Sequence, residues 1–208
     1  MSDDSFFREV DQELRQDRAK ALWDRYGTAI IAAAIAVVVA TSAVVGWDYW
    51  SQSRADRSGD AYLHALSLAR DGKTGEAKAA LAALEADGYG AYPVLARMRA
   101  ATLSAEAGDH AGAVAGFDSV AADSAVPVSI REMARLRAGL LLVDHGSYAD
   151  VASRVEALTA ETSALRHAAR EALGLAAWKE GRMADAATLY DQIVNDEGAP
   201  QNLRQRAT

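Results

Sequence analysis

The chain has 208 residues, a formal net charge of -7 and a pI of about 5.1, so it lacks the basic surface expected of a nucleic-acid-binding protein. It contains no cysteine, which excludes disulfides, thiolate metal sites and cysteine nucleophiles. Alanine is abundant and proline occurs three times, which favours helices separated by tight turns. The predicted fold class is therefore all-α.

Residues 1–26 are predicted to form a cytoplasmic amphipathic tail. Their charges alternate in sign, and apolar residues recur at approximate helical spacing: Phe6, Phe7, Val10, Leu14 and Ala21. This pattern fits either a solvated helix beside a membrane or a docking helix for a cytoplasmic or membrane partner.

Residues 27–47 contain no charged side chain and are predicted to form a single transmembrane helix. A helix of that length is roughly 30 Å long, which matches the hydrocarbon core of a bilayer. A buried soluble helix is the first alternative, but this segment has no polar stripe and would need covering on all sides. A cleaved signal peptide is the second, but the segment before it is long and carries seven acidic residues.

Aromatic residues gather at both ends of this span, where membranes concentrate Trp and Tyr. Trp23 and Tyr26 mark one interface, and Trp47, Tyr49 and Trp50 mark the other. Close to the span, four basic residues lie on its N-terminal side (Arg15, Arg18, Lys20 and Arg25), against Arg54 and Arg57 on the other side. The bias predicts a cytoplasmic N-terminus, a juxtamembrane linker at 48–57 and a C-terminal part across the membrane, which in a bacterium is the periplasm.

Residues 58–208 show an internal repeat. Gly72, Gly108, Gly146 and Gly181 follow one another at spacings of 36, 38 and 35 residues. A small residue, Ala or Gly, stands seven positions before each glycine. Five positions after each glycine stands Ala or Val. This predicts about four helical hairpins in which the glycine ends the first helix and small residues let the two helices approach. Ser129 with Glu132, and Ser147 with Asp150, predict capped helix starts.

The spacing resembles the tetratricopeptide repeat, and the fourth copy matches it best, with Leu173, Gly174, Gly181, Ala186 and Tyr190 at the motif positions. The copies depart from the motif eleven residues before each glycine, where it prefers a large apolar residue. Ala61, Arg97, Arg135 and Arg170 stand there. The expected architecture is an N-terminal transmembrane helix followed by a tetratricopeptide-like α-solenoid.

The arrangement as a whole, with "GWDYW" leaving the membrane before such repeats, resembles the YfgM-like ancillary subunits of the bacterial Sec translocon. The resemblance implies a single-span inner-membrane protein that associates with the translocon and with periplasmic chaperones and helps exported chains pass onward. A scaffold for another envelope complex, in outer-membrane assembly or division, is the alternative, since a repeat fixes a binding mode and not a partner.

No catalytic, cofactor-binding or metal-binding motif is present in the sequence, and no enzyme activity, cofactor or metal is predicted. The histidines His64, His110, His145 and His167 lack metal-ligand spacing, and His110 and His145 are expected to be polar turn residues. A carboxylate-based envelope enzyme stays a remote alternative, because no acid pair supports it.

The predicted binding site is an apolar groove on the first helices of the hairpins, suited to non-polar segments of unfolded chains or to an amphipathic partner helix. The alternative is that these side chains form the core. The groove residues are Tyr62, Leu66, Leu95, Met98, Met133, Leu136, Leu140, Val143, Leu175 and Trp178.

Overall fold

The computed structural model describes the backbone of residues 3–208 and the side chains of residue 20 and residues 23–208. The described chain is helical and has no strand, which confirms the all-α prediction. The chain divides into two compact units, Met1–Ser53 and Arg54–Thr208. The helices are α1 (Asp3–Arg70), α2 (Thr74–Asp87), α3 (Tyr92–Glu106), α4 (His110–Ala122), α5 (Val128–His145), α6 (Tyr148–Val155), the 3-10 turn η1 (Glu156–Thr159), α7 (Arg166–Lys179), α8 (Met183–Val194) and α9 (Gln201–Arg206).

The first unit contains the stretch of α1 that is long and apolar enough to cross a membrane. Its apolar side chains are exposed along the predicted span, as a lipid-facing helix requires. The rings of Trp47 and Trp50 lie 5.3 Å apart. Residues 48–57, expected as a linker, are part of α1 and helical. The amphipathic pattern of the N-terminal tail lies outside the described side chains, which do not include Phe6, Phe7, Val10, Leu14 and Ala21.

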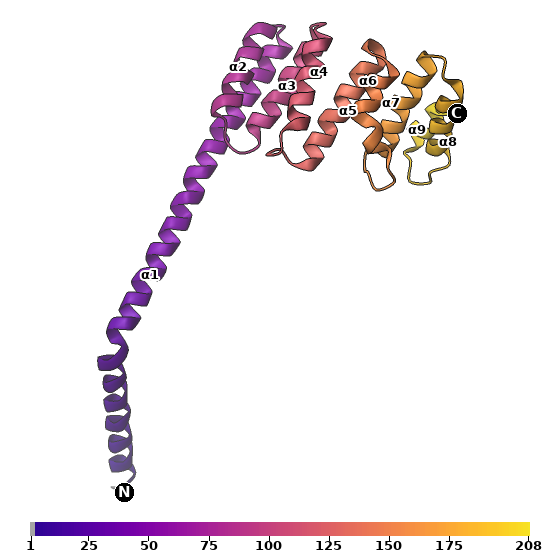
Figure 1. The fold of residues 1–208 in the computed structure, drawn as a ribbon. Coiled ribbons are helices and arrows are strands. Elements are labelled where there is room, and N and C mark those ends of the chain that lie inside the picture. The colour runs from indigo at the N-terminus through magenta and orange to yellow at the C-terminus, as the bar shows by residue number, and fades with distance from the viewer. Residues whose placement is uncertain (1–2) are drawn as a thin grey trace. The chain divides into compact units, whose positions relative to one another are not determined.

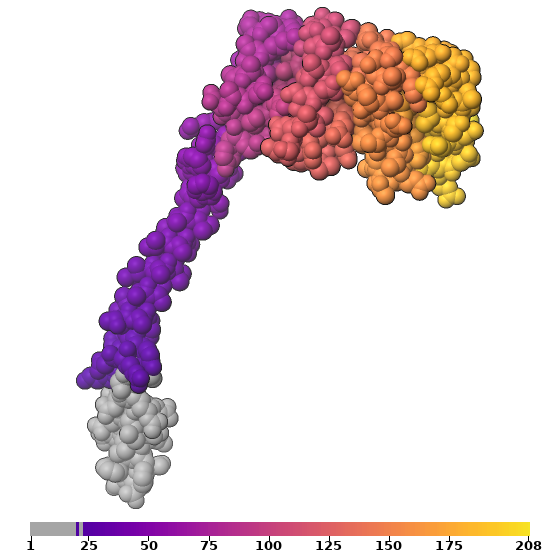
Figure 2. Space-filling model, viewed as in Figure 1, coloured from indigo at the N-terminus to yellow at the C-terminus, as the bar shows by residue number. Residues whose placement is uncertain are grey.

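The second unit is a series of helical hairpins (Figure 1). The end of α1 precedes α2, and the pairs α3 with α4, α5 with α6, and α7 with α8 follow, with α9 after them. Contacts run between neighbours in this series, as in a solenoid. In the space-filling view the hairpins follow one another in chain order, from magenta to yellow (Figure 2). The predicted solenoid of about four hairpins is therefore confirmed.

All four repeat glycines follow the ends of their first helices as predicted, and three of them are left-handed. Gly72, Gly108 and Gly181 have φ values of 75°, 83° and 76°, in the left-handed region that an L-residue with a Cβ disfavours. Gly146 is different, because its φ of -138° and ψ of -172° are extended backbone. Gly146 therefore ends α5 without a left-handed backbone, and α5 and α6 are joined through Gly146 and Ser147.

The two predicted helix caps have opposite outcomes. At α6 the Ser147 side chain accepts from the Asp150 backbone N–H, and the Asp150 side chain accepts from the Ser147 backbone N–H, so this capping box is confirmed. The box predicted at Ser129 and Glu132 is wrong. Helix α5 begins at Val128 after Pro127, which places Ser129 inside the first turn and not at the cap.

The two helices approach closely inside three of the hairpins. A Cβ on Gly174 would stand 2.9 Å from the ring of Tyr190, and one on Gly139 would collide with Val155. A Cβ on Gly116 would stand 2.9 Å from the Cβ of Ala101. In these three hairpins the small residue of the first helix thus lies against a residue eight or nine positions after the repeat glycine, and in the first hairpin the predicted pair Ala65 and Ala77 is buried in one cluster.

The core of the second unit consists of three apolar clusters arranged along the series. The first lies among the end of α1, α2 and α3, around Leu81. The second joins α3, α4 and α5 around Phe117, and the third joins α5, α6, η1 and α7 around Val151 and Val155. First helices α3 and α5 each contribute to two clusters, which leaves one side of each helix for solvent.

Candidate functional site

Five of the ten predicted groove residues are exposed on the first helices α3, α5 and α7. We call this set the apolar face. The exposed fractions are 39% for Leu95, 37% for Met133, 43% for Leu140, 39% for Leu175 and 61% for Trp178.

Four predicted groove residues are half-buried. Tyr62 packs against the first cluster, Met98 against the second and Val143 against the third. Leu66 is also half-buried on α1. These side chains present part of their surface to solvent.

Leu136 is not a surface residue, so its assignment to an open groove is corrected. It is 5% exposed and packs in the third cluster with Val151, Val155 and Leu173. Leu136 lies at the edge of the exposed stripe of α5, about 40° around the helix from Leu140 and on the side that packs against α6 and α7. The open part of α5 is centred on Met133 and Leu140.

Helical periodicity places polar groups between the exposed apolar ones. On α5, Arg137 lies four residues after Met133 and three before Leu140, so the three share one stripe. On α3, Leu95, Arg99 and Thr102 have the same spacing. Arg137 Nη1 donates to Thr102 Oγ1 at 3.4 Å, which shows that the stripes of α3 and α5 are neighbours.

A lysine links the exposed sides of α5 and α7. Lys179 lies four residues after Leu175, and its Nζ donates to the carbonyl oxygens of Val143 at 3.0 Å and Asp144 at 2.8 Å. These carbonyls belong to the last turn of α5, where a cation satisfies groups that the helix leaves unpaired. The exposed sides of α3, α5 and α7 are therefore linked side by side, with cationic side chains between the apolar members of the face.

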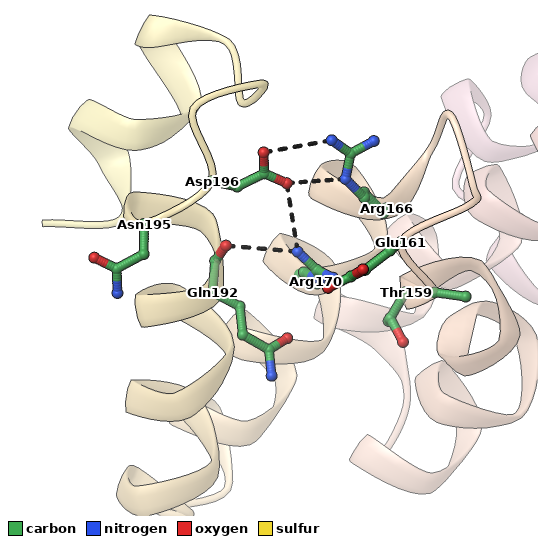
Figure 3. A pocket seen from close by; sticks show the side chains of 8 residues that line it. Thr159, Glu161, Arg166, Arg170, Gln192, Asn195 and Asp196 are labelled. Atoms are coloured by element: carbon green, nitrogen blue, oxygen red, sulfur yellow. Dashed lines mark hydrogen bonds and ion pairs between the residues drawn. The ribbon is translucent and has the colours of Figure 1, made fainter.

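A polar cleft of about 800 Å³ lies on another part of the second unit, between η1, α7 and the end of α8 (Figure 3). Arg166 Nε donates to Asp196 Oδ2 at 2.9 Å, and His167 Nε2 lies 2.8 Å from the same oxygen. The hydrogen bond from Arg166, followed by that from His167, holds the pKa of Asp196 well below its usual range. Arg170 is buried and contacts Asp196 at 3.8 Å. The cluster fastens α7 to the loop after α8.

The two histidines of the repeat turns are in contact, which the sequence did not predict. The rings of His110 and His145 stack with their centroids 3.6 Å apart and an angle of 12° between planes. His110 begins α4 and His145 ends α5, so the contact joins two hairpins. In the described part of the chain no three metal-ligating side chains come together.

Sequence reasoning also missed exposed apolar residues beside the predicted set. Leu63 is 60% exposed on α1, and Val128 and Met183 are exposed at the first residues of α5 and α8. Leu63 stands nine positions before its repeat glycine, as Arg99 and Arg137 do before theirs. The repeat register therefore indicates that Leu63 lies in the exposed stripe of the first helices, at the position of Arg99 and Arg137.

Comparison with known proteins gives one family. A family model described as a tetratricopeptide repeat-like domain matches residues 20–207, nearly the whole chain. Domains of this kind are typically non-enzymatic scaffolds that bind proteins. No curated protein and no solved structure matches the chain significantly.

Proposed function

We propose that this chain, which belongs to the tetratricopeptide repeat-like domain family, is a membrane-anchored adapter whose repeat domain binds non-polar protein segments. The apolar face is the observation that carries the proposal. Solvent-exposed Leu, Met and Trp side chains recur on three consecutive first helices, and a recurrence of exposed apolar side chains on one side of a repeat domain suits a protein-binding surface. Unbranched Met133 adapts its shape to different ligands.

The chemistry of the apolar face suits an amphipathic helix or an extended non-polar segment. Leu140 and Leu175 supply apolar contact, while Arg137 and Lys179 lie in the same stripes and face polar groups of the ligand. Such an open, mixed surface favours transient binding.

The more specific role is that of an ancillary subunit of the Sec translocon. In this role the chain is a single-span protein of the bacterial inner membrane with a cytoplasmic N-terminus. The periplasmic repeat domain receives newly exported chains and passes them to periplasmic chaperones. The apolar stretch of α1, the aromatic residues at both of its ends and the exposed apolar face all suit this role.

Site-specific photo-cross-linking in intact membranes tests the proposal. A photoreactive residue in place of Leu140 is expected to cross-link to exporting chains, to translocon subunits and to a periplasmic chaperone. The control position is Ala187, which is exposed on the second helix α8 and outside the apolar face. Cross-links from position 140 to division or outer-membrane assembly proteins alone would transfer the role to the alternative scaffold. Equal products from both positions would remove the apolar face as the binding site.

A further inference from the structure

The three arginines that depart from the repeat motif each line a cleft of the same construction. Arg97 lines a cleft of about 260 Å³ among α2, α3 and α4, and Arg135 one of about 370 Å³ among α4, α5 and α6. Arg170 lines the cleft of about 800 Å³ among η1, α7 and α8. In every case a first helix supplies the arginine; second helices of two hairpins supply the walls for Arg97 and Arg135, and η1 with the residues after it replaces one of them for Arg170. The clefts therefore form a row along the second helices.

Two of these arginines have a carboxylate partner supplied by their own hairpin. Arg97 Nη1 donates to Asp123 Oδ2 at 2.7 Å, and its Nε lies 3.6 Å from Glu85. Arg170 contacts Asp196. Asp123 and Asp196 occupy the same register, fifteen residues after Gly108 and Gly181. The pairing is thus a repeated feature, in which an arginine near the start of the first helix meets an aspartate after the end of the second.

Arg135 forms no ion pair or hydrogen bond with any residue whose side chain is described. The residue fifteen positions after Gly146 is Glu161, and it does not reach Arg135. Helix α6 ends at Val155 and passes into η1, after which Glu161 lines the neighbouring cleft with Arg166 and Arg170 (Figure 3). Because of the 3-10 turn, Glu161, which corresponds in register to Asp123 and Asp196, lies in the next cleft and not in that of Arg135.

The cleft of Arg135 also has an excess of positive charge. Its charged lining residues are Arg135, Arg154 and Asp118, which is two positive charges against one negative charge. Asp118 is already engaged, because Arg154 Nη2 donates to its Oδ2 at 2.8 Å and Arg154 Nε to its Oδ1 at 3.4 Å. Arg135 is half-buried, which weakens the screening of its charge by water.

This cleft is separate from the apolar face. Arg135 lies five residues before Leu140, which places the two side chains about 140° apart around α5. A ligand on Leu140 therefore leaves Arg135 accessible from the side of the second helices.

We propose that the cleft of Arg135 is a second protein-binding site that receives a carboxylate side chain, Asp or Glu, of a partner polypeptide. The partner carboxylate accepts hydrogen bonds from the Arg135 guanidinium, in the arrangement that Asp123 has with Arg97. Arg–carboxylate pairs of this kind are short and directional. The site does not depend on the apolar face, and its ligand is acidic where that of the apolar face is non-polar.

The test uses the full chain in an uncharged detergent and two end-blocked peptides, tetraglutamate and tetraglutamine. The arginine Nε–H signals are followed by NMR, and the signal of Arg135 is identified by its loss in Arg135→Gln. Tetraglutamate is expected to shift the Arg135 signal and tetraglutamine is not. Arg135→Gln should weaken tetraglutamate binding at least about tenfold, since a hydrogen bond to a charged group is lost. Arg135→Lys should retain part of the binding.

Arg97→Gln is the matched control, because it removes the equivalent arginine whose carboxylate partner is internal. It is expected to leave tetraglutamate binding within about twofold of the unchanged chain. An equal loss in Arg97→Gln, an equal response to both peptides, or an equal shift with inorganic phosphate would each overturn the carboxylate site. None of these outcomes affects cross-linking at Leu140, so failure here is distinguishable from failure of the adapter function.

Discussion

Gly174 lies directly against Tyr190: a Cβ added to the glycine would stand 2.9 Å from the Cε1 and Cζ atoms of the ring. Real Cβ atoms essentially never come this close to such atoms, so the fourth hairpin depends on a residue without a side chain here. The tyrosine is a motif residue of the repeat, and the contact explains why glycine precedes it in the facing helix.

Gly174→Ala is expected to lower the free energy of unfolding by about 1 to 3 kcal/mol, because the ring must move to admit a methyl group. Gly75→Ala is the control, since α2 has open space around that glycine. The control should be neutral or slightly stabilising, because alanine favours a helix over glycine. Urea unfolding of both variants measures the difference, and equal effects would contradict the close packing of Gly174 on Tyr190.

Gly181 tests backbone strain without crowding. Its φ is 76° and no atom lies within 4 Å of an added Cβ. Gly181→Ala should therefore cost about 1 kcal/mol through conformation alone. Gly181→Asn should recover part of that loss, because asparagine tolerates the left-handed region better than alanine. Thermal unfolding followed by circular dichroism ranks the two, and an asparagine variant less stable than the alanine variant would argue against strain.

Leu136 and Leu140 separate core from surface on one helix. Leu136→Gln buries an amide in an apolar cluster and should cost at least about 1 to 3 kcal/mol. Leu140→Gln should change stability by no more than about 0.5 kcal/mol, because the side chain is 43% exposed. If it also weakens capture of an unfolded chain, the apolar face binds ligand. Full capture by a stable Leu140→Gln variant would argue against that face.

The free energy of unfolding is expected to depend on pH through Asp196. Hydrogen bonds from Arg166 and then His167 lower the pKa of Asp196 in the folded chain, so the unfolded chain takes up this proton first as the pH falls. The stabilisation is complete above the unfolded pKa of about 4 and is lost as the pH falls below it. Asp196→Asn should flatten the acid side of the stability profile. An unchanged slope between pH 5 and 2, values taken around the unfolded carboxyl pKa, would exclude this contribution.

Orientation is tested with protease added to spheroplasts. The four basic residues before the span, against two after it, predict that Ser51 to Thr208 is digested while an N-terminal tag survives. Lysed cells, in which both sides are accessible, provide the control. Loss of the N-terminal tag alone would reverse the orientation.

The repeat register could be derived from the sequence because its glycines are local signals. A left-handed residue ends a helix at Gly72, Gly108 and Gly181, and no distant contact is needed to place it. Gly146 is not left-handed, because it is followed directly by Ser147, the N-cap of α6, and the backbone that joins α5 to α6 is extended. The position of Leu136 depends on the rotation of α5 against α6 and α7, which a single helical pattern does not specify.

The carboxylate partners of the arginines could be identified only from the folded structure. Arg97 and Asp123 are 26 residues apart, and they meet because the hairpin brings the start of one helix beside the end of the next. The register alone would have paired Arg135 with Glu161 in the same way. That inference fails at η1, whose tighter winding ends the regular second helix of the third hairpin.

The three core clusters in series give the domain a one-dimensional cooperativity. In such an array, damage to one cluster weakens its neighbours through their shared helix and leaves distant repeats less affected. Hydrogen exchange would then vary by hairpin after a single substitution, with the shared helices α3 and α5 carrying the effect from one cluster to the next. A partner that spans α3, α5 and α7 would couple the clusters that the chain itself connects only pairwise.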